Sequence, residues 1–131
     1  MIEAKKLVQL EWVSRALMAL ILLTAGTSKF FSGGGFKGYY AGLFGNEDLR
    51  INVPGAIIEL YLTCIPFIEI ALGLSLLITA LKPYTIYAWY LFMASLLVGH
   101  YILQEWSAVN QMLAYFFLGM ICHLLPTRAE I

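Results

Sequence analysis

Charged side chains are scarce in this sequence, because Asp, Glu, Lys and Arg together make up 12% of its 131 residues. Soluble domains carry about 25%, so the composition excludes an ordinary water-soluble fold. Hydrophobic residues account for 61%, and the mean hydropathy is +0.81, as expected of a membrane protein. The formal net charge is zero, which removes any argument from composition for nucleic-acid binding or for a polybasic lipid-binding face.

Cysteine and histidine are also rare, with two residues of each type. Cys64 and Cys122 fall in different apolar segments at opposite depths, so they cannot reach the ~6 Å Cα separation of a disulfide. The sequence has no Cys-x-x-Cys motif, and dithiol catalysis therefore has no basis in it. His100 and His123 are expected near opposite membrane faces, which argues against a two-histidine metal or haem site. We predict no metal site.

Long polar segments are missing as well, so the whole chain, residues 1–131, is predicted to be a single integral membrane domain. Four uncharged or nearly uncharged runs are long enough to cross a bilayer core of ~30 Å at ~1.5 Å per residue. The predicted helices cover about residues 7–31, 55–81, 83–104 and 107–126. The interacting partner that follows directly from this pattern is the lipid bilayer.

The only long connection, between Phe31 and Gly55, combines glycines with aromatic residues. Gly33, Gly34 and Gly35 end the first helix, and they lack the Gly-Lys-Ser/Thr element of a phosphate-binding loop. Four apolar residues then recur at helical spacing, which predicts a short amphipathic segment in the outer interface that covers the bundle. They are Phe36, Tyr39, Tyr40 and Leu43. The predicted fold class is all-α, a four-helix transmembrane bundle with an aromatic, Gly-containing amphipathic loop between helices 1 and 2.

The distribution of basic residues predicts the orientation. Lysines and arginines near the membrane edges are more numerous on the side that carries the two termini. On that side are Lys5, Lys6, Arg15, Lys82 and Arg128, and on the other are Lys29, Lys37 and Arg50. Both termini are therefore expected in the cytoplasm.

Glu69 lies at the midpoint of the apolar run from Ile57 to Leu81. A carboxylate there costs a few kcal/mol on insertion scales and usually faces other helices or a wet cavity. Its matched depth and opposite charge predict an ion pair with Arg15. Two interpretations remain open: a buried ion pair that only fixes helix packing, or a carboxylate that carries a proton or contacts a quinone.

A second polar group is predicted toward the outer edge, beneath the aromatic loop. Its members are expected at similar depth and would form a polar vestibule; they are Lys29, Glu59, His100, Gln104 and Asn110. His100 is the only histidine among them. The alternatives are that His100 is an interfacial hydrogen-bonding residue and that Arg15 and Lys29 extend to opposite interfaces.

Several short motifs resemble the DoxX-like membrane proteins, relatives of DoxD and MauE. They are Arg15 early in the first helix, Ala25-Gly26-Thr27-Ser28-Lys29-Phe30 at its end, the aromatic loop, and Pro66-Phe67-Ile68-Glu69 with Gly73 in the second helix. The resemblance implies a four-helix, multi-pass protein of the bacterial or archaeal inner membrane, with Arg15, Lys29 and Glu69 as the polar positions typical of the family. Some relatives are linked to quinone-coupled sulfur oxidation and others to maturation of redox enzymes.

Three function hypotheses follow from the residues and the resemblance together. The leading one is a non-catalytic membrane subunit or accessory protein of a quinone-linked redox system, with a lipid or quinone bound near Glu69 and a redox enzyme as partner subunit. The second is a quinone-reducing membrane oxidoreductase component that uses Glu69 or His100 for proton transfer. The third is an assembly or packing factor for another membrane protein. No covalently bound cofactor is expected, and homo-oligomerisation is compatible with all three.

Overall fold

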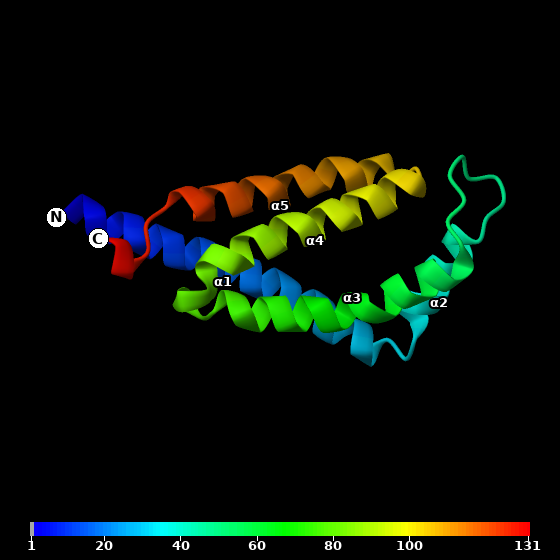
Figure 1. Cartoon of the computed structure of the whole chain (residues 1–131), viewed down its shortest axis with the longest axis horizontal. Coiled ribbons are helices and arrows are strands. Elements are labelled where there is room, and N and C mark those ends of the chain that lie inside the picture. The colour runs from blue at the N-terminus through cyan, green and yellow to red at the C-terminus, as the bar shows by residue number, and fades with distance from the viewer. Residues whose placement is uncertain (1) are drawn as a thin grey trace.

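The structure is a computed structural model that describes residues 2–131, and these residues form helices and connecting loops (Figure 1). In chain order, the elements are α1 (Ile2–Phe31), α2 (Gly35–Phe44), α3 (Gly55–Leu76), the 3₁₀ turn η1 (Thr79–Leu81), α4 (Lys82–Ile102), α5 (Trp106–Leu124) and the 3₁₀ turn η2 (Arg128–Glu130).

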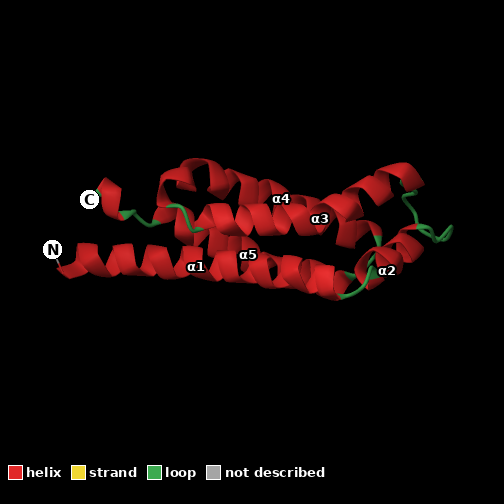
Figure 2. Ribbon diagram, turned by 90° about the horizontal axis from the view of Figure 1, so that it is seen from below, coloured by secondary structure: helices red, strands yellow, loops and turns green. Residues whose placement is uncertain are grey.

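Four of these helical segments are long and apolar enough to cross a membrane: α1, α3, η1 with α4, and α5 with the segment after it. The predicted all-α, four-span fold is therefore confirmed, and the chain is a multi-pass membrane protein. The long helices run along the longest axis of the molecule, with α2 at one end (Figure 2). Both termini lie together at the other end (Figure 1), as an even number of crossings requires.

Helices α1 and α3 pack antiparallel over much of their lengths, and two glycines permit their close approach. A Cβ atom on Gly26 would lie 2.8 Å from the Ile70 side chain, and one on Gly73 would lie 2.9 Å from Leu23. Small residues of this kind let membrane helices approach closely enough for backbone and side chains to interlock. The α1–α3 contact therefore depends on both glycines.

Helices α4 and α5 form a hairpin, which is joined by the short turn at Leu103–Glu105. The fully buried Trp89 lies flat against Gly119, where an added Cβ would be 2.6 Å from the indole ring. The indole nitrogen donates to the Tyr115 carbonyl at 3.0 Å. A large aromatic side chain with a satisfied polar atom thus joins the two helices.

Two helix boundaries differ from the predicted ones. Helix α1 begins at Ile2 rather than near residue 7, so its first turns extend past the ends of the other spans, toward the termini-bearing end. Helix α3 ends at Leu76 rather than Leu81, because the chain leaves the helix at Ile78 (φ −96°, ψ 107°) and reverses through η1 into α4. The Leu74 and Ser75 carbonyls accept from the Leu77 and Ile78 nitrogens, and the Leu76 carbonyl is left for a partner outside the helix.

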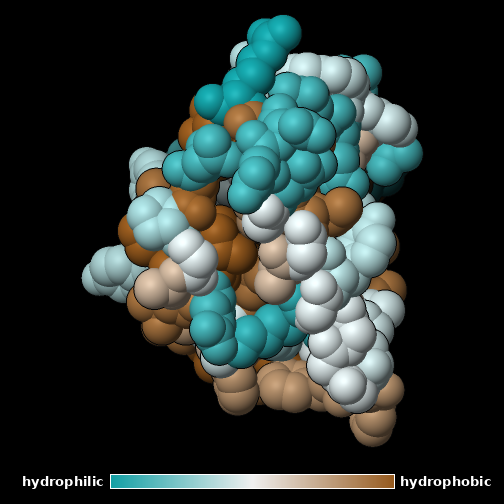
Figure 3. All heavy atoms as spheres, turned by 90° about the vertical axis from the view of Figure 1, so that its right-hand side faces the viewer, coloured by the Kyte–Doolittle hydropathy of each residue, from teal (hydrophilic) through white to brown (hydrophobic). Residues whose placement is uncertain are grey.

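The end of the molecule that carries α2 and the following loop differs in character from the helix flanks. Seen from that end, hydrophilic residues gather over the surface, with hydrophobic residues beside and between them (Figure 3). Along the spans, by contrast, large apolar side chains are exposed, among them Leu20, Leu60, Leu91 and Phe117. This distribution is expected when the flanks face lipid and the ends face water.

Candidate functional site

The bundle buries two groups of ionisable side chains, at opposite ends of α1. The first, called here the Glu11 cluster, consists of Glu11, Arg15 and Lys82, each at most 6% exposed. The second is the Lys29–Glu69 pair, in which Glu69 is buried and Lys29 is partly exposed. Lys29 follows Glu11 by 18 positions, which correspond to ~27 Å of helical rise, so the two groups are separate sites.

The Glu11 cluster joins α1 to the α3–α4 turn. Arg15 Nε donates to Glu11 Oε1 at 2.7 Å, while its two terminal nitrogens donate to the Leu76 carbonyl and the Thr79 hydroxyl, both at 2.9 Å. Lys82 Nζ lies 3.4 Å from Glu11 Oε1 and donates to the Leu125 carbonyl at 2.7 Å. Arg15 thereby satisfies a carbonyl that the end of α3 leaves free.

The predicted Arg15–Glu69 ion pair is wrong, and the position of the end of α3 explains why. Arg15 contacts Leu76, whereas Glu69 lies seven residues earlier in α3, about 10 Å further along the axis. At that level α1 presents Lys29 instead. Depths counted from the predicted helix ends misplaced α1 against α3 by several residues.

The Lys29–Glu69 pair is held by two short hydrogen bonds. Lys29 Nζ donates to Glu69 Oε1 at 2.7 Å and to Oε2 at 2.9 Å, and its third contact, with the Ala25 carbonyl, is longer at 3.4 Å. The same ammonium lies 4.9 Å from the centre of the Phe36 ring, within cation–π distance. The Lys29 side chain is 17% exposed and that of Glu69 only 3%.

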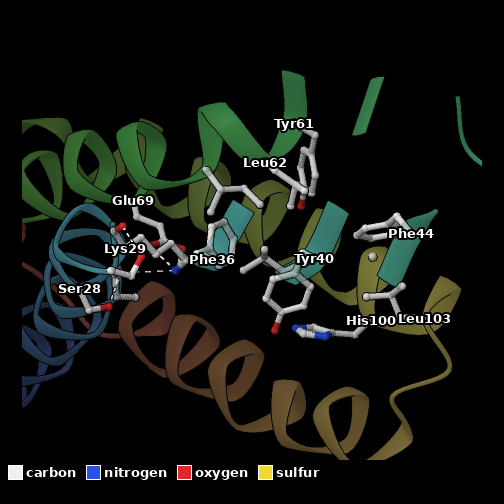
Figure 4. A pocket seen from close by; sticks show the side chains of 15 residues that line it. Ser28, Lys29, Phe36, Tyr40, Phe44, Tyr61, Leu62, Glu69, His100 and Leu103 are labelled. Atoms are coloured by element: carbon white, nitrogen blue, oxygen red, sulfur yellow. Dashed lines mark hydrogen bonds and ion pairs between the residues drawn. The ribbon is translucent and has the colours of Figure 1, made fainter. Parts of the chain in front are cut away.

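This pair forms part of the wall of a cavity of about 460 Å³. Side chains from α1, α2, α3 and α4 converge on it (Figure 4). Most of the lining is apolar or aromatic, and the polar groups are few. The lining includes Ala25, Ser28, Lys29, Ser32, Phe36, Tyr40, Phe44, Tyr61, Leu62, Ile65, Glu69, Leu96, His100 and Leu103. A mainly apolar cavity with a few converging polar groups is the usual form of a small-molecule site.

One face of α2 covers the cavity. Phe36, Tyr40 and Phe44 follow each other at four-residue spacing and all line it, while Tyr39 is 61% exposed. The Tyr40 ring packs against Phe36 at 5.1 Å and against His100 at 6.4 Å between ring centres. Burial and the nearby Glu105 carboxylate raise the pKa of the Tyr40 phenol. The phenol therefore remains a hydrogen-bond donor at physiological pH.

The cavity unites some of the residues predicted for the vestibule and separates others. Lys29 and His100 line it together with Glu69, and His100 Nδ1 lies 3.0 Å from Glu105 Oε1. Glu59 faces a different hollow and contacts Lys37 at 3.2 Å. Gln104 and Asn110 are exposed and do not line the cavity. Helix α2 nevertheless covers the bundle at this end, as predicted.

Sequence reasoning missed Glu11 and Lys82 as buried charges. The signal for Glu11 was present, since a glutamate four residues before an arginine is a favourable pair on a helix. Lys82 precedes a proline at a span boundary and was read as an interfacial charge. Phe44, at the end of α2, was also missed, although it continues the spacing of Phe36 and Tyr40.

The sulfur and metal chemistry of the described chain is limited. Cys64 and Cys122 are both free thiols, and the Cys122 sulfur lies 4.0 Å from Glu11 Oε1. Within residues 2–131, no three His, Cys, Asp or Glu side chains converge closely enough to hold a metal ion. The chemistry of the cavity is thus that of hydrogen bonds, one ion pair and aromatic contacts.

Comparison of the chain with models of protein families, with curated proteins and with solved structures gives no match in any of the three. The function therefore has to be argued from the cavity itself.

Proposed function

We propose that this protein is a membrane subunit or accessory protein of a quinone-linked redox system, and that its cavity binds a quinone-like ligand. The observation that supports this most directly is the Lys29–Glu69 pair, a buried ion pair that opens into an otherwise apolar cavity. A pair that served only packing would gain nothing from contact with such a space.

The polar groups of the cavity are arranged to suit a ring with oxygen atoms on opposite sides. Lys29 contacts Phe36, Phe36 contacts Tyr40, and Tyr40 contacts His100. Figure 4 shows this line of side chains from the Lys29–Glu69 pair to the imidazole. One carbonyl of the ring would accept from Lys29, whose long 3.4 Å contact with Ala25 is the one most easily exchanged. The other would accept from the Tyr40 phenol, and the aromatic rings would pack against the ring face.

In this role the protein is not itself the catalyst. It holds the ligand for a redox-enzyme partner in the same bacterial or archaeal membrane, in line with the resemblance of its motifs to DoxX-like proteins. The alternative of a quinone-reducing component differs in one requirement: Glu69 would have to release and accept a proton during turnover.

The test is to purify the protein from its native membranes and measure extracted quinone per protein chain. We expect bound quinone in the wild type and a roughly tenfold loss in Lys29→Met and in Tyr40→Phe, since each variant removes a donor that leaves a ligand oxygen unpaired. Lys37→Gln serves as the matched control, because Lys37 pairs with the exposed Glu59 outside the cavity.

The result that would overturn the proposal is a folded wild-type protein that carries phospholipid but no quinone, or cavity variants that retain as much quinone as Lys37→Gln. Glu69→Gln separates the two redox roles. If the protein only holds the ligand, this variant should fold, retain quinone and support turnover by the partner. If Glu69 carries a proton, turnover should fall sharply while quinone stays bound, because an amide cannot titrate.

The proposed orientation, with both termini in the cytoplasm, has an independent test. Asn46 and Ala129 are exposed at opposite ends of the molecule. A cysteine at residue 46 should react with a membrane-impermeant reagent added outside intact cells, and a cysteine at residue 129 should be protected. The reverse pattern would invert the topology.

A further inference from the structure

The Glu11 cluster contains more positive than negative charge. Arg15 and Lys82 both face the single carboxylate of Glu11, at 2.7 Å and 3.4 Å. All three side chains are at least nine-tenths buried. Buried charges are normally neutralised by a partner, so this cluster is one negative charge short.

A groove of about 570 Å³ opens beside the cluster, between the first half of α1 and the two 3₁₀ turns. Glu11, Arg15 and Thr79 line it, and Arg128 joins them from η2, beyond the end of α5. Glu130, the acidic residue of η2, accepts from the Thr127 backbone nitrogen at 3.0 Å, and within residues 2–131 it forms no ion pair with Arg128. Arg128 therefore adds a further positive charge to the groove.

Arg15 retains donors for a further acceptor. Three of its five N–H groups are used by Glu11, Leu76 and Thr79. One N–H on each terminal nitrogen thus has no acceptor within residues 2–131. An oxyanion in the groove would accept from these donors and from the Arg128 guanidinium, and planar guanidinium groups suit phosphate oxygens particularly well.

The position of the groove indicates where such an oxyanion would come from. Its lining includes Thr79, in the turn between the spans α3 and α4, and a turn between two spans is expected at a membrane surface. Trp12 and Val13 line the same groove and are 58% and 48% exposed, which offers an apolar surface on its bilayer side. Tryptophan is characteristic of the headgroup level of membranes.

We infer that this groove binds the phosphate group of an anionic phospholipid, with Arg128 and Arg15 as its ligands and the acyl chains lying along Trp12 and Val13. The site is distinct from the cavity at the other end of the bundle. The lipid phosphate supplies the negative charge that the Glu11 cluster lacks.

The test is native mass spectrometry of the detergent-purified full chain, with phosphatidylglycerol or phosphatidylcholine added in matched amounts. We expect preferential retention of phosphatidylglycerol by the wild type. Arg128→Gln should weaken that retention by roughly fivefold to tenfold, the worth of one basic residue at a charged membrane surface. Arg50→Gln is the matched control, because Arg50 is an exposed arginine in the loop at the opposite end of the molecule.

Arg128 is exposed in a short terminal turn, so its substitution should leave the thermal unfolding of the lipid-free protein unchanged, which makes a binding loss interpretable. Equal retention of the two lipids, or equal effects of Arg128→Gln and Arg50→Gln, would overturn the inference. Titration with inorganic phosphate in lipid-free detergent distinguishes the source of the oxyanion. Weak binding of free phosphate supports a lipid site, whereas binding as tight as that of phosphatidylglycerol would refute it.

Discussion

The Glu11 cluster and the Lys29–Glu69 pair are built from the same chemistry and differ in what surrounds them. Glu11 is closed in by Arg15, Lys82 and the thiol of Cys122. Glu69 also has a close basic partner, but that partner reaches a cavity and is 17% exposed. A buried charge in a membrane helix is therefore not by itself a sign of ligand chemistry. What such a charge can do depends on the space beside it, which is a mainly apolar cavity at the Lys29–Glu69 pair and a groove with additional basic residues at the Glu11 cluster.

The largest effect is expected when the negative charge at the centre of the Glu11 cluster is removed. Glu11→Gln would leave Arg15 and Lys82 buried and facing each other without a carboxylate. The loss of a partner in a buried pair typically costs about 3–5 kcal/mol. We expect a loss of this size, together with a reduced folded yield, in thermal or chemical unfolding of the detergent-solubilised protein.

Glu3→Gln provides the control for this experiment, since Glu3 is an exposed residue of the same helix. It should change the free energy of unfolding by less than about 0.5 kcal/mol. If Glu11→Gln were as mild as Glu3→Gln, the Glu11 carboxylate would not be what neutralises Arg15 and Lys82.

The Lys29–Glu69 pair should tolerate the loss of its carboxylate better than the Glu11 cluster does. In Glu69→Leu the stranded Lys29 ammonium is already partly exposed and can turn toward the cavity, so we expect a loss of about 1–3 kcal/mol, and partial recovery in Lys29→Leu/Glu69→Leu. A double-mutant cycle measured by thermal unfolding reports the coupling. In contrast, the losses of Arg15→Leu and Glu69→Leu should add within about 0.5 kcal/mol, as for residues without a shared partner. Strong coupling between Arg15 and Glu69 would contradict the observed geometry.

A glycine-to-alanine substitution next to the Lys29–Glu69 pair should have a smaller effect on the free energy of unfolding. In Gly26→Ala the new methyl group would lie 2.8 Å from Ile70 and 3.1 Å from both the Glu69 Cβ and the Pro66 carbonyl. Overpacking costs about 1–3 kcal/mol, and the helix propensity of alanine returns about 1 kcal/mol. We expect a net destabilisation of about 1 kcal/mol and a weakened Lys29–Glu69 coupling.

Gly42→Ala is the matched case in α2, where an added Cβ meets nothing within 4 Å. At that position the higher helix propensity of alanine should dominate, and the stability of the folded protein should be unchanged or slightly increased. A Gly26→Ala variant that behaved like Gly42→Ala would show that α1 and α3 can separate without cost.

The smallest effect is expected at the exposed ion pair of Lys37 and Glu59, 3.2 Å apart with side chains 41% and 71% exposed. Such surface pairs contribute about 0–1 kcal/mol and are screened by salt. Lys37→Gln should change the unfolding free energy by less than about 0.5 kcal/mol, and 1 M salt should abolish the difference from wild type. A larger effect that did not depend on salt would show that this pair contributes to stability in the same way as the two buried groups.

The fold could be predicted from the sequence, but the pairing of the buried charges could not. Hydropathy and span length identify the four helices, and the spacing of Phe36 and Tyr40 identifies α2. The partner of Glu69 depends instead on the register of α1 against α3, which is set by where α3 stops. Hydropathy alone did not locate that end, because Leu77, Ile78 and Leu81 continue the apolar run beyond Leu76.

The residues of the candidate site could be predicted only in part, and the reason is similar. Glu69, Lys29 and His100 could be identified as ionisable residues within apolar segments, and all three line the cavity. Glu59 satisfies the same criterion and lies outside it. The difference arises from which side of α3 faces the bundle at that level, and this depends on tertiary packing.

The two groups also differ in when their partners become available during synthesis. Glu11 and Arg15 are four residues apart on one helix, so they can pair as soon as α1 forms. Lys29 has to wait for Glu69, 40 residues later, which is about 2 to 8 s at ordinary rates of translation. During that interval the first helix carries an unpaired cation near its far end. Until the second span, α3, has been made, Lys29 has to be accommodated by the membrane-insertion machinery or by water at that interface. Because Glu11 and Arg15 pair within α1, Lys29 is the last of these three charges to gain its partner.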